Sequence, residues 1–351
     1  MPDTDKIQRV LVTGGTGYLA SWIIKMLLDK GIQVHTTVRN PLDSEKTAHL
    51  KALDKNNQLT IFKADLLDIG SFEESMQGCD LVVHTASPFF ISGFKNPETE
   101  LIEPAKLGTR NVLEQAKKTT CVKRVVLTSS VAAIYGDNID IKKTANGIFT
   151  EDEWNGTSSV NHNPYPFSKT IAEKEAWKIV KSQNQWDLVV INPGWIFGPS
   201  LSKRKDSMSI KTMIDFGSGG YRTGVPELFT SFVDVRDVAK AHVNAGFFKH
   251  AKGRHIVVSK TIKMMDIADI IRKKYKNKYP LPKMTVPKFI FWLIGPFLGF
   301  TRKYVSLNIS IPINFNNSNS IDNLELKYIS VEKTVEDHFQ QVLDDGLLNH
   351  E

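Results

Sequence analysis

The sequence predicts an α/β protein built on a doubly wound parallel sheet, with a smaller and mostly C-terminal second domain. Near the start, the apolar stretch Val10–Val12 runs directly into closely spaced glycines and then into helix-like spacing. Further along, apolar strand patterns alternate with helical ones, which is typical of a parallel sheet covered by helices. The 351 residues, 41% of them hydrophobic, are enough to bury a large core.

Charge and cysteine content narrow the class of protein. The net charge is +7, but the lysines are spread along the chain, which favours a solvated basic surface and indicates no nucleic-acid partner. No charged segment followed by an apolar run opens the sequence, so we expect a cytoplasmic protein. Cys79 and Cys121 lie outside any metal-ligand spacing, so we expect both to be reduced and structural and expect no metal.

The first glycine-rich stretch, Thr13–Ala20, follows a strand pattern and precedes an apolar helix from Trp22 to Leu28. Glycines at this spacing let the backbone turn sharply and approach a pyrophosphate, which is held at the positive end of the new helix. The stretch therefore predicts a dinucleotide-binding turn, although a purely structural turn is the alternative. The residues expected to contact the cofactor here are Thr13, Gly14, Thr16, Gly17, Tyr18 and Leu19.

The second predicted strand, Gln33–Val38, ends at Arg39. At this place in dinucleotide folds an acidic residue binds the ribose hydroxyl of NAD, whereas an arginine accommodates the 2′-phosphate of NADP. Arg39 therefore predicts NADPH/NADP+ as the cofactor. Lys46 adds a second positive charge in the following polar loop, with an ordinary solvated lysine as the alternative.

Three further strands are predicted before residue 130, over 59–64, 80–84 and 122–127, separated by helices over 71–77 and 98–118. The carboxyl ends of parallel strands meet at one edge of the sheet, where a dinucleotide binds. We therefore expect cofactor contacts from the residues that follow these strands, namely Asp65, Leu66, Thr85, Ala86, Ser87 and Thr128.

The second half of the chain is less regular. After a long polar loop over 136–164, a helix opens at Tyr165 and a sixth strand covers 188–192. A strand at 232–235, a helix through 238–245, a strand over 254–258 and a C-terminal helix over 332–343 follow, among scattered aromatic residues. We predict that 1–193 and 229–251 form the dinucleotide-binding domain, and that 194–228 and 252–351 form the substrate-binding domain.

The most apolar segment is Phe289–Phe300, 12 residues that include a proline. A membrane-spanning helix needs about 20 apolar residues. We therefore expect no membrane span and predict a buried or substrate-covering helix here, with attachment to a membrane surface as the less favoured alternative.

Tyr165, Lys169 and Ser130 form a candidate catalytic set. Tyr165 and Lys169 are four residues apart and so share a helix face, where the lysine ammonium is expected to lower the pKa of the tyrosine from about 10. Ser130 follows the fifth strand and is placed to donate to a carbonyl oxygen. The pair alone has little weight in a chain with 8 tyrosines, so its position downstream of the dinucleotide turn carries the prediction.

Taken together, these motifs resemble the extended short-chain dehydrogenases/reductases, in particular the branch of dihydroflavonol reductase, cinnamoyl-CoA reductase and microbial aldehyde or ketone reductases. The resemblance covers about residues 10–260 well and the C-terminal hundred loosely. It rests on Thr13–Ala20, Thr37–Arg39, Ala64–Leu66, His84–Pro88, Thr128–Ser130, Tyr165–Lys169, Asn192–Gly194 and Phe232–Asp237.

The resemblance implies that Ser130, Tyr165 and Lys169 are catalytic, that Arg39 and Lys46 hold the 2′-phosphate, and that Pro193 touches the nicotinamide. It implies NADPH-dependent reduction of an apolar or aromatic aldehyde or ketone by a monomer or homodimer. Flavonoid-reducing members carry an asparagine near the position of Tyr135, so a flavonoid substrate is not expected. The alternatives are a nucleotide-sugar epimerase or dehydratase that retains NAD, a hydroxysteroid-type dehydrogenase, and a non-catalytic NADP-binding protein.

Overall fold

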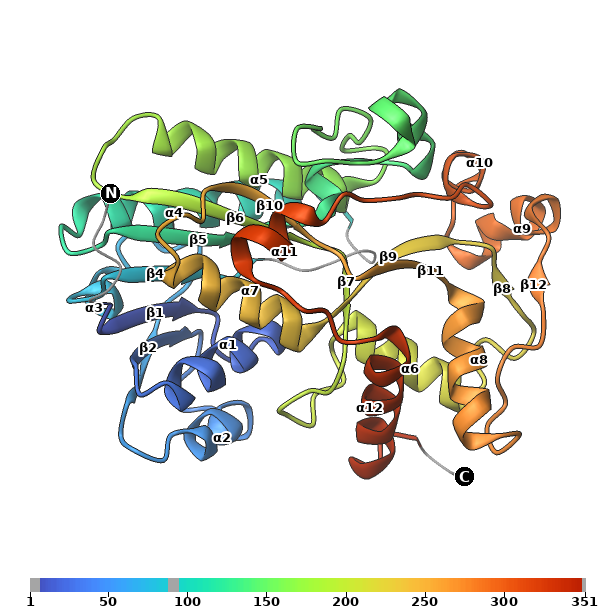
Figure 1. Ribbon diagram of the computed structural model, residues 1–351, viewed down its shortest axis with the longest axis horizontal. Coiled ribbons are helices and arrows are strands. Elements are labelled where there is room, and N and C mark those ends of the chain that lie inside the picture. The colour runs from blue at the N-terminus through green and yellow to red at the C-terminus, as the bar shows by residue number, and fades with distance from the viewer. Residues whose placement is uncertain (1–6, 88–94, 349–351) are drawn as a thin grey trace.

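The computed structural model describes residues 7–87 and 95–348. Its largest element is a seven-stranded, fully parallel sheet in the order β10-β6-β5-β4-β1-β2-β3 (Figure 1). This arrangement confirms the predicted doubly wound, Rossmann-type α/β fold. The strands are β1 (Arg9–Thr13), β2 (Gln33–Val38), β3 (Leu59–Lys63), β4 (Leu81–His84), β5 (Arg124–Thr128), β6 (Asp187–Pro193) and β10 (Gly253–Val257).

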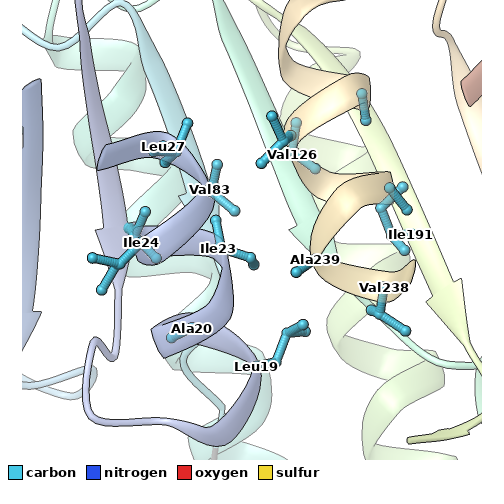
Figure 2. Packing of buried hydrophobic residues seen from close by; sticks show 14 of the residues in the cluster. Leu19, Ala20, Ile23, Ile24, Leu27, Val83, Val126, Ile191, Val238 and Ala239 are labelled. Carbon is cyan, nitrogen blue, oxygen red and sulfur yellow. The ribbon is translucent and has the colours of Figure 1, made fainter. Parts of the chain in front are cut away.

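Helices cover both faces of this sheet, because successive strand residues point to opposite sides. Val10 and Val12 face a core that includes α1 and α7, whereas Leu11 between them faces a core that includes α4 and α5. Figure 2 shows side chains of α1 and α7 meeting over β4, β5 and β6. The helices around the sheet are α1 (Tyr18–Asp29), α2 (Ser44–Leu53), α3 (Glu73–Met76), α4 (Glu103–Lys118) with the preceding η2 (Glu98–Ile102), α5 (Pro164–Val180) and α7 (Val235–Phe247).

A second group of elements lies beyond one end of the large sheet (Figure 1). It contains a three-stranded sheet, β11-β9-β7, and a two-stranded sheet, β12-β8, with a separate hydrophobic core. Its strands are β7 (Trp195–Phe197), β8 (Val225–Pro226), β9 (Phe229–Asp234), β11 (Lys260–Lys263) and β12 (Thr285–Val286). Its helices are α6 (Met208–Ser218), α8 (Met264–Tyr275), α9 (Lys288–Ile294), η6 (Gly295–Leu298), α10 (Arg302–Asn308) and α12 (Val331–Asp344). The helix α11 (Ser318–Leu324) instead packs on β10 and α7 of the large sheet, where Leu324 joins the core.

Two strands pair differently from the predicted division of the chain. β9 was expected with the dinucleotide-binding part, but it pairs with β7 and β11 in the smaller sheet. β10 was expected with the substrate-binding part, but it pairs with β6 at the edge of the large sheet. The chain therefore crosses between the two parts after β9 and after β10, rather than before each of these strands as predicted. The domain ranges stay a prediction.

The segment 136–164 is more structured than the long polar loop that we expected. It contains η4 (Asn138–Lys143) and η5 (Ala145–Gly147), preceded by η3 (Val131–Ala133). Asn138 is buried, and its amide donates to the backbone carbonyls of Phe229 at 3.0 Å and Ile311 at 3.1 Å. Polar residues that suggested a solvated loop are used here to satisfy buried backbone groups.

The segment 289–300 corrects a second expectation. Gly295 and Pro296 end α9 after seven residues, so the helix is too short to lie across a core. Phe291 is buried against Val305 and Ile309, but Phe297 is 90% exposed. The expectation of burial is therefore wrong for most of these side chains, and a substrate-covering role stays a prediction. Within 7–87 and 95–348, no helix combines the length and the apolar character needed to cross a bilayer.

The two cysteines are unpaired, as expected, with Cys79 buried and Cys121 partly buried. Burial raises the pKa of the Cys79 thiol to about 12. A thiol with such a pKa is an inert part of the core at neutral pH.

Candidate active site

The glycine turn between β1 and α1 fits closely against the ends of two neighbouring strands. Gly14 has φ +72°, and a Cβ on it would come within 3.0 Å of the Cβ of Ala86, which follows β4. A Cβ on Gly15 would lie 2.2 Å from the hydroxyl of Thr36 on β2. Among the described residues, no side chain caps the start of α1 at Gly17. The turn therefore offers bare backbone and a helix N-terminus to an anion, which fits a dinucleotide pyrophosphate.

Thr13 joins the turn to the end of β4. Its hydroxyl accepts the backbone N–H groups of Thr85 and Ala86, both at 3.1 Å, and is bonded to Nδ1 of His84 at 2.8 Å. The hydroxyl of Thr85 donates to the carbonyl of Thr13 at 2.6 Å. Burial lowers the pKa of His84 to about 3, so this ring is neutral. The hydroxyls of Thr13 and Thr85 are thus hydrogen-bonded within the protein, and these bonds hold the end of β1 against the end of β4, at the predicted cofactor edge.

The turn is also tied to the end of β2, where the predicted phosphate-binding arginine lies. The N–H of Gly15 donates to the carbonyl of Thr37 at 2.9 Å, and the N–H of Gly14 donates to the Thr37 hydroxyl at 3.3 Å. Arg39 follows two residues later and is exposed. The guanidinium is therefore carried by the strand end that borders the turn, as its predicted role requires.

Lys46 is exposed in the first turn of α2, where its ammonium lies 3.1 Å from the carboxylate of Asp43. It lies near enough to Asp206 to contribute to the lowered pKa of that carboxyl, whose main cause is a hydrogen bond from Arg204. The guanidinium of Arg204 also donates to the carbonyl of Thr16 in the glycine turn at 3.0 Å. Arg204 is therefore a cation at the cofactor edge that the sequence analysis missed, because it lies in an irregular segment with no motif around it.

Two residues of the glycine motif have side chains engaged elsewhere. Leu19 is buried in the core between α1 and α7, and the Tyr18 hydroxyl donates to the carbonyl of Gly198 after β7. Asp65, at the end of β3, is exposed, and one of its carboxylate oxygens accepts the N–H of Leu67 at 2.9 Å. A ligand would therefore meet Leu19 only through its backbone, whereas Asp65 is open to solvent.

The remaining predicted cofactor residues occupy the same edge of the sheet. The carbonyl of Leu66 accepts from the amide of Asn111 at 2.8 Å. Pro193 is buried at the end of β6, where it is paired in register with Val257. Pro88, the last residue of the His84–Pro88 motif, lies outside the described residues.

The predicted catalytic serine and tyrosine are in contact. Ser130 directly precedes η3 and caps it, since its hydroxyl accepts the N–H of Ala132 at 3.1 Å. The same side chain is hydrogen-bonded to the hydroxyl of Tyr165. Tyr165 is the second residue of α5, and Asn163, which precedes the helix, adopts φ 55° and ψ 59°. The amide of Asn163 donates to the carboxylate of Asp137 at 2.8 Å. The start of α5 is thus held firmly, and the hydroxyl of Tyr165 with it.

Lys169 is buried, and its ammonium donates to the carbonyl of Thr128 at the end of β5, at 3.1 Å. Burial lowers the pKa of Lys169 to about 8, and the charge of Glu173 opposes that shift. Burial raises the pKa of Tyr165 above its usual value, with the hydrogen bond to Ser130 opposing it. The structure therefore shows the phenol pKa raised rather than lowered as expected, because a buried phenolate loses its hydration.

A small cavity beside Lys169 gathers several predicted residues from two strand ends and from α5. Ala86 and Ser87 follow β4, and Thr128 ends β5, where its hydroxyl bonds to Nε2 of His242 at 2.7 Å. The complete lining consists of His84, Ala86, Ser87, Thr109, Leu127, Thr128, Ser129, Lys169, Ala172 and Glu173. Residues up to 89 positions apart in the sequence, His84 and Glu173, thus meet at one point of the sheet edge.

Glu173 and Arg254 form a buried ion pair that the sequence analysis missed. The Arg254 guanidinium donates to the Glu173 carboxylate at 2.6 Å, and the carboxylate also accepts from the hydroxyl of Ser129 and from the amide of Asn192 at 2.9 Å. Glu173 is one helical turn beyond Lys169, and this spacing on a buried face was the one available signal. The negative charge of the Glu173 carboxylate raises the pKa of Lys169 and so favours its charged form.

The fold and this edge define a dinucleotide-binding α/β protein, with a glycine turn at the point where the strand order reverses. Residues 10–259 match the model of the NAD dependent epimerase/dehydratase family, and the chain belongs to this family.

Known relatives agree with the resemblance seen in the sequence. A cinnamoyl-CoA reductase of Medicago truncatula is 39% identical over 274 residues, which cover 76% of this chain and 81% of that protein. An anthocyanidin reductase of Arabidopsis thaliana is 38% identical over 297 residues, covering 80% and 86%. Among solved structures, the yeast methylglyoxal/isovaleraldehyde reductase Gre2 complexed with NADPH superimposes with a TM-score of 0.79 at 26% identity, covering 96% of this chain and 98% of that one.

Proposed function

We propose that this protein reduces an aldehyde or ketone to the alcohol with NADPH. The observation that carries the proposal is the hydrogen bond between Ser130 and Tyr165, at the same sheet edge as Lys169 and the glycine turn. The similar proteins described above are reductases, and one of them is complexed with NADPH. The compartment, expected to be the cytoplasm, stays a prediction.

Different residues at the sheet edge bind different parts of NADPH in this proposal. The backbone of the glycine turn holds the pyrophosphate, Arg39 with Lys46 holds the 2′-phosphate, and Lys169 binds the ribose next to the nicotinamide. Pro193 borders the nicotinamide, and Asp65 with Leu66 borders the adenine. When bound, NADPH supplies the hydride.

Ser130 and Tyr165 act on the carbonyl oxygen of the substrate. Both hydroxyls donate to that oxygen and stabilise the negative charge that develops on it. Tyr165 then gives its proton to the oxygen, which a phenol with a raised pKa still carries at neutral pH. The Ser130 hydroxyl and the positive charge of Lys169 stabilise the phenolate that is left.

An apolar or aromatic substrate is favoured by an aromatic cluster that packs with Val131 and Ile134, which follow Ser130 in the chain. The ring of Tyr135 stacks on Phe149 with centroids 4.7 Å apart and contacts Phe315 at 5.7 Å. The Tyr135 hydroxyl is hydrogen-bonded to Ser231, so this side chain presents little free polarity. A flavonoid, whose hydroxyls need a polar partner here, fits less well.

The direct test is NADPH oxidation with a panel of aliphatic and aromatic carbonyl compounds. We expect Tyr165→Phe to lower kcat about 100-fold or more, which is the usual contribution of a general acid. Tyr275→Phe is the matched control, because the Tyr275 hydroxyl bonds to Gln340 on α12 rather than at the sheet edge. Failure to reduce any carbonyl, or full activity of Tyr165→Phe, would contradict the proposal.

An epimerase or dehydratase activity on a nucleotide sugar is the second candidate, because the matching family bears that name. Such enzymes recycle a retained NAD, whereas Arg39 favours a phosphorylated cofactor. The cofactor released from the purified protein on denaturation separates the two: retained NAD favours the second candidate. A hydroxysteroid-type dehydrogenase would instead show turnover with NADP+ and a steroid alcohol, and a non-catalytic NADP-binding protein would show no turnover.

A further inference from the structure

An exposed apolar surface lies on α9 and η6, at the end of the molecule opposite β2 and β3 (Figure 1). We call it the apolar tip. Side chains at four of its positions are more than half exposed, with Phe289 at 67%, Leu293 at 53%, Phe297 at 90% and Leu298 at 57%. Ile290, Ile294 and Phe300 add further exposed apolar area. An exposed apolar surface of this kind marks a site of contact with something apolar.

The apolar tip is held rigidly by the chain beneath it. Phe291 is buried against Val305 and Ile309, and its ring lies 5.4 Å from that of Phe300. The ammonium of Lys288 donates to the carbonyl of Ser306 on α10 at 2.9 Å. The outward side chains are therefore presented by a packed scaffold, with an open hollow beside Lys288, Phe289, Trp292 and Leu293.

The surroundings of the apolar tip are positively charged. Residues 281–321, which include the tip, contain four lysines and arginines and neither aspartate nor glutamate. Lys283, Arg302 and Lys303 are exposed next to the tip, and Arg302 lies over the ring of Trp292 at 4.5 Å. Glu227 is an acidic residue close to the end of α10, because its backbone carbonyl accepts the N–H of Ser310. Its carboxylate is paired with Lys263 at 3.3 Å, so its charge is balanced by that lysine.

We propose that the apolar tip attaches the protein to the surface of an anionic lipid bilayer without crossing it. Phenylalanine and leucine side chains enter the boundary between headgroups and acyl chains, tryptophan lies at the headgroup level, and the lysines and arginines meet the anionic headgroups. A second copy of the chain is the weaker occupant, because a two-fold interface on this surface would place its basic residues against their own copies.

Co-sedimentation of the full-length protein with vesicles tests this proposal. One set of vesicles contains phosphatidylcholine alone, and the other contains about a third phosphatidylserine. We expect binding to the anionic vesicles that weakens with salt, since a lipid surface potential is screened by ions. Little or no binding is expected to the neutral vesicles.

Variants separate the apolar contribution from the charged one. We expect Leu293→Ser with Phe297→Ser to weaken binding about tenfold or more, and Lys303→Glu to weaken it about fivefold or more. Ile69→Ser is the matched control, because Ile69 is 81% exposed on the loop after β3, and its binding should equal that of the unaltered protein. These side chains are exposed, so the variants keep the fold, which unchanged NADPH binding and circular dichroism verify.

Three outcomes would overturn the proposal. The first is no sedimentation with either set of vesicles. The second is equal binding by Leu293→Ser with Phe297→Ser and the unaltered protein. The third is a dimer in light scattering that the double variant converts to a monomer while vesicle binding is absent, which would assign the tip to a second copy of the chain.

Discussion

Acid should unfold this protein steeply, because four histidines are buried in the neutral form. Burial lowers the pKa of His84 and His338 to about 3 and that of His242 and His255 to about 4. An unfolded chain has histidines with a pKa of about 6.5, so it binds more protons than the folded one below that pH. The stability linked to these residues is fully present above pH 6.5 and is lost as pH falls toward the folded-state values.

His338 on α12 offers the clearest single test. Its Nδ1 accepts the N–H of Gly198 at 3.1 Å, and its ring stacks on Tyr18 next to the glycine turn. Each pH unit below 6.5 costs one such histidine about 1.4 kcal/mol, so pH 5 costs about 2 kcal/mol. Four of them together lose about 8 kcal/mol, which is comparable with the whole stability of a typical protein.

The assay is urea unfolding, followed by circular dichroism, of the unaltered protein and of His338→Gln between pH 7.5 and pH 5. The variant has one fewer proton to bind on unfolding, so its deficit in stability should shrink by about 2 kcal/mol across this range. Asn56→Gln, a change at an exposed position that adds and removes no titrating group, should show a constant difference from the unaltered protein. A constant difference for His338→Gln as well would refute the reasoning.

Three further changes test the cofactor edge and the catalytic set. Arg39→Asp should weaken NADPH binding about 10-fold to 100-fold and leave NADH binding much less affected, as measured by fluorescence titration, because a charge-assisted contact to the 2′-phosphate is lost; equal losses would show that Arg39 does not bind that phosphate. Gly15→Ala should lower both the Tm and the NADPH affinity, with a stability loss of about 1–3 kcal/mol, since its Cβ would meet the Thr36 hydroxyl at 2.2 Å; an unchanged Tm would contradict the close fit. Glu173→Gln should lower the Lys169 pKa below about 8, so the fall of kcat with rising pH should begin at lower pH; an unshifted profile would leave Glu173 a purely structural role.

The large sheet was predictable because its signals are local. Val10, Leu11 and Val12 form a continuous apolar run, as a strand buried on both faces requires, and the glycines that follow permit only a few backbone paths. The order of such units along the chain then fixes the sheet, since parallel strands need helical crossovers. The predicted catalytic and cofactor residues follow from the same logic, because strand ends converge on one edge.

The features that escaped prediction depend on partners distant in the sequence. Arg254 lies 81 residues from Glu173, and no sequence pattern near either residue predicts that the two pair. Arg204 reaches the carbonyl of Thr16 from 188 residues away. The segment 289–300 is interpreted from its sequence as a buried or substrate-covering helix because hydrophobicity reports the composition of a segment, and not whether another element covers it.

The spacing of Tyr165 and Lys169 predicted one helix face correctly, but it gave the wrong sign for the tyrosine pKa because spacing carries no information on burial. Burial disfavours whichever form is charged, so it raises the pKa of the phenol and lowers that of the ammonium. At neutral pH the phenol therefore keeps its proton, which is the form that reduction of a carbonyl consumes. Lys169 would lose its charge by the same effect, and the buried carboxylate of Glu173 opposes that loss. Burial therefore keeps Tyr165 protonated, so that it can act as the acid. The charge of Lys169 is favoured by Glu173, which is one turn further along α5 and is paired with Arg254.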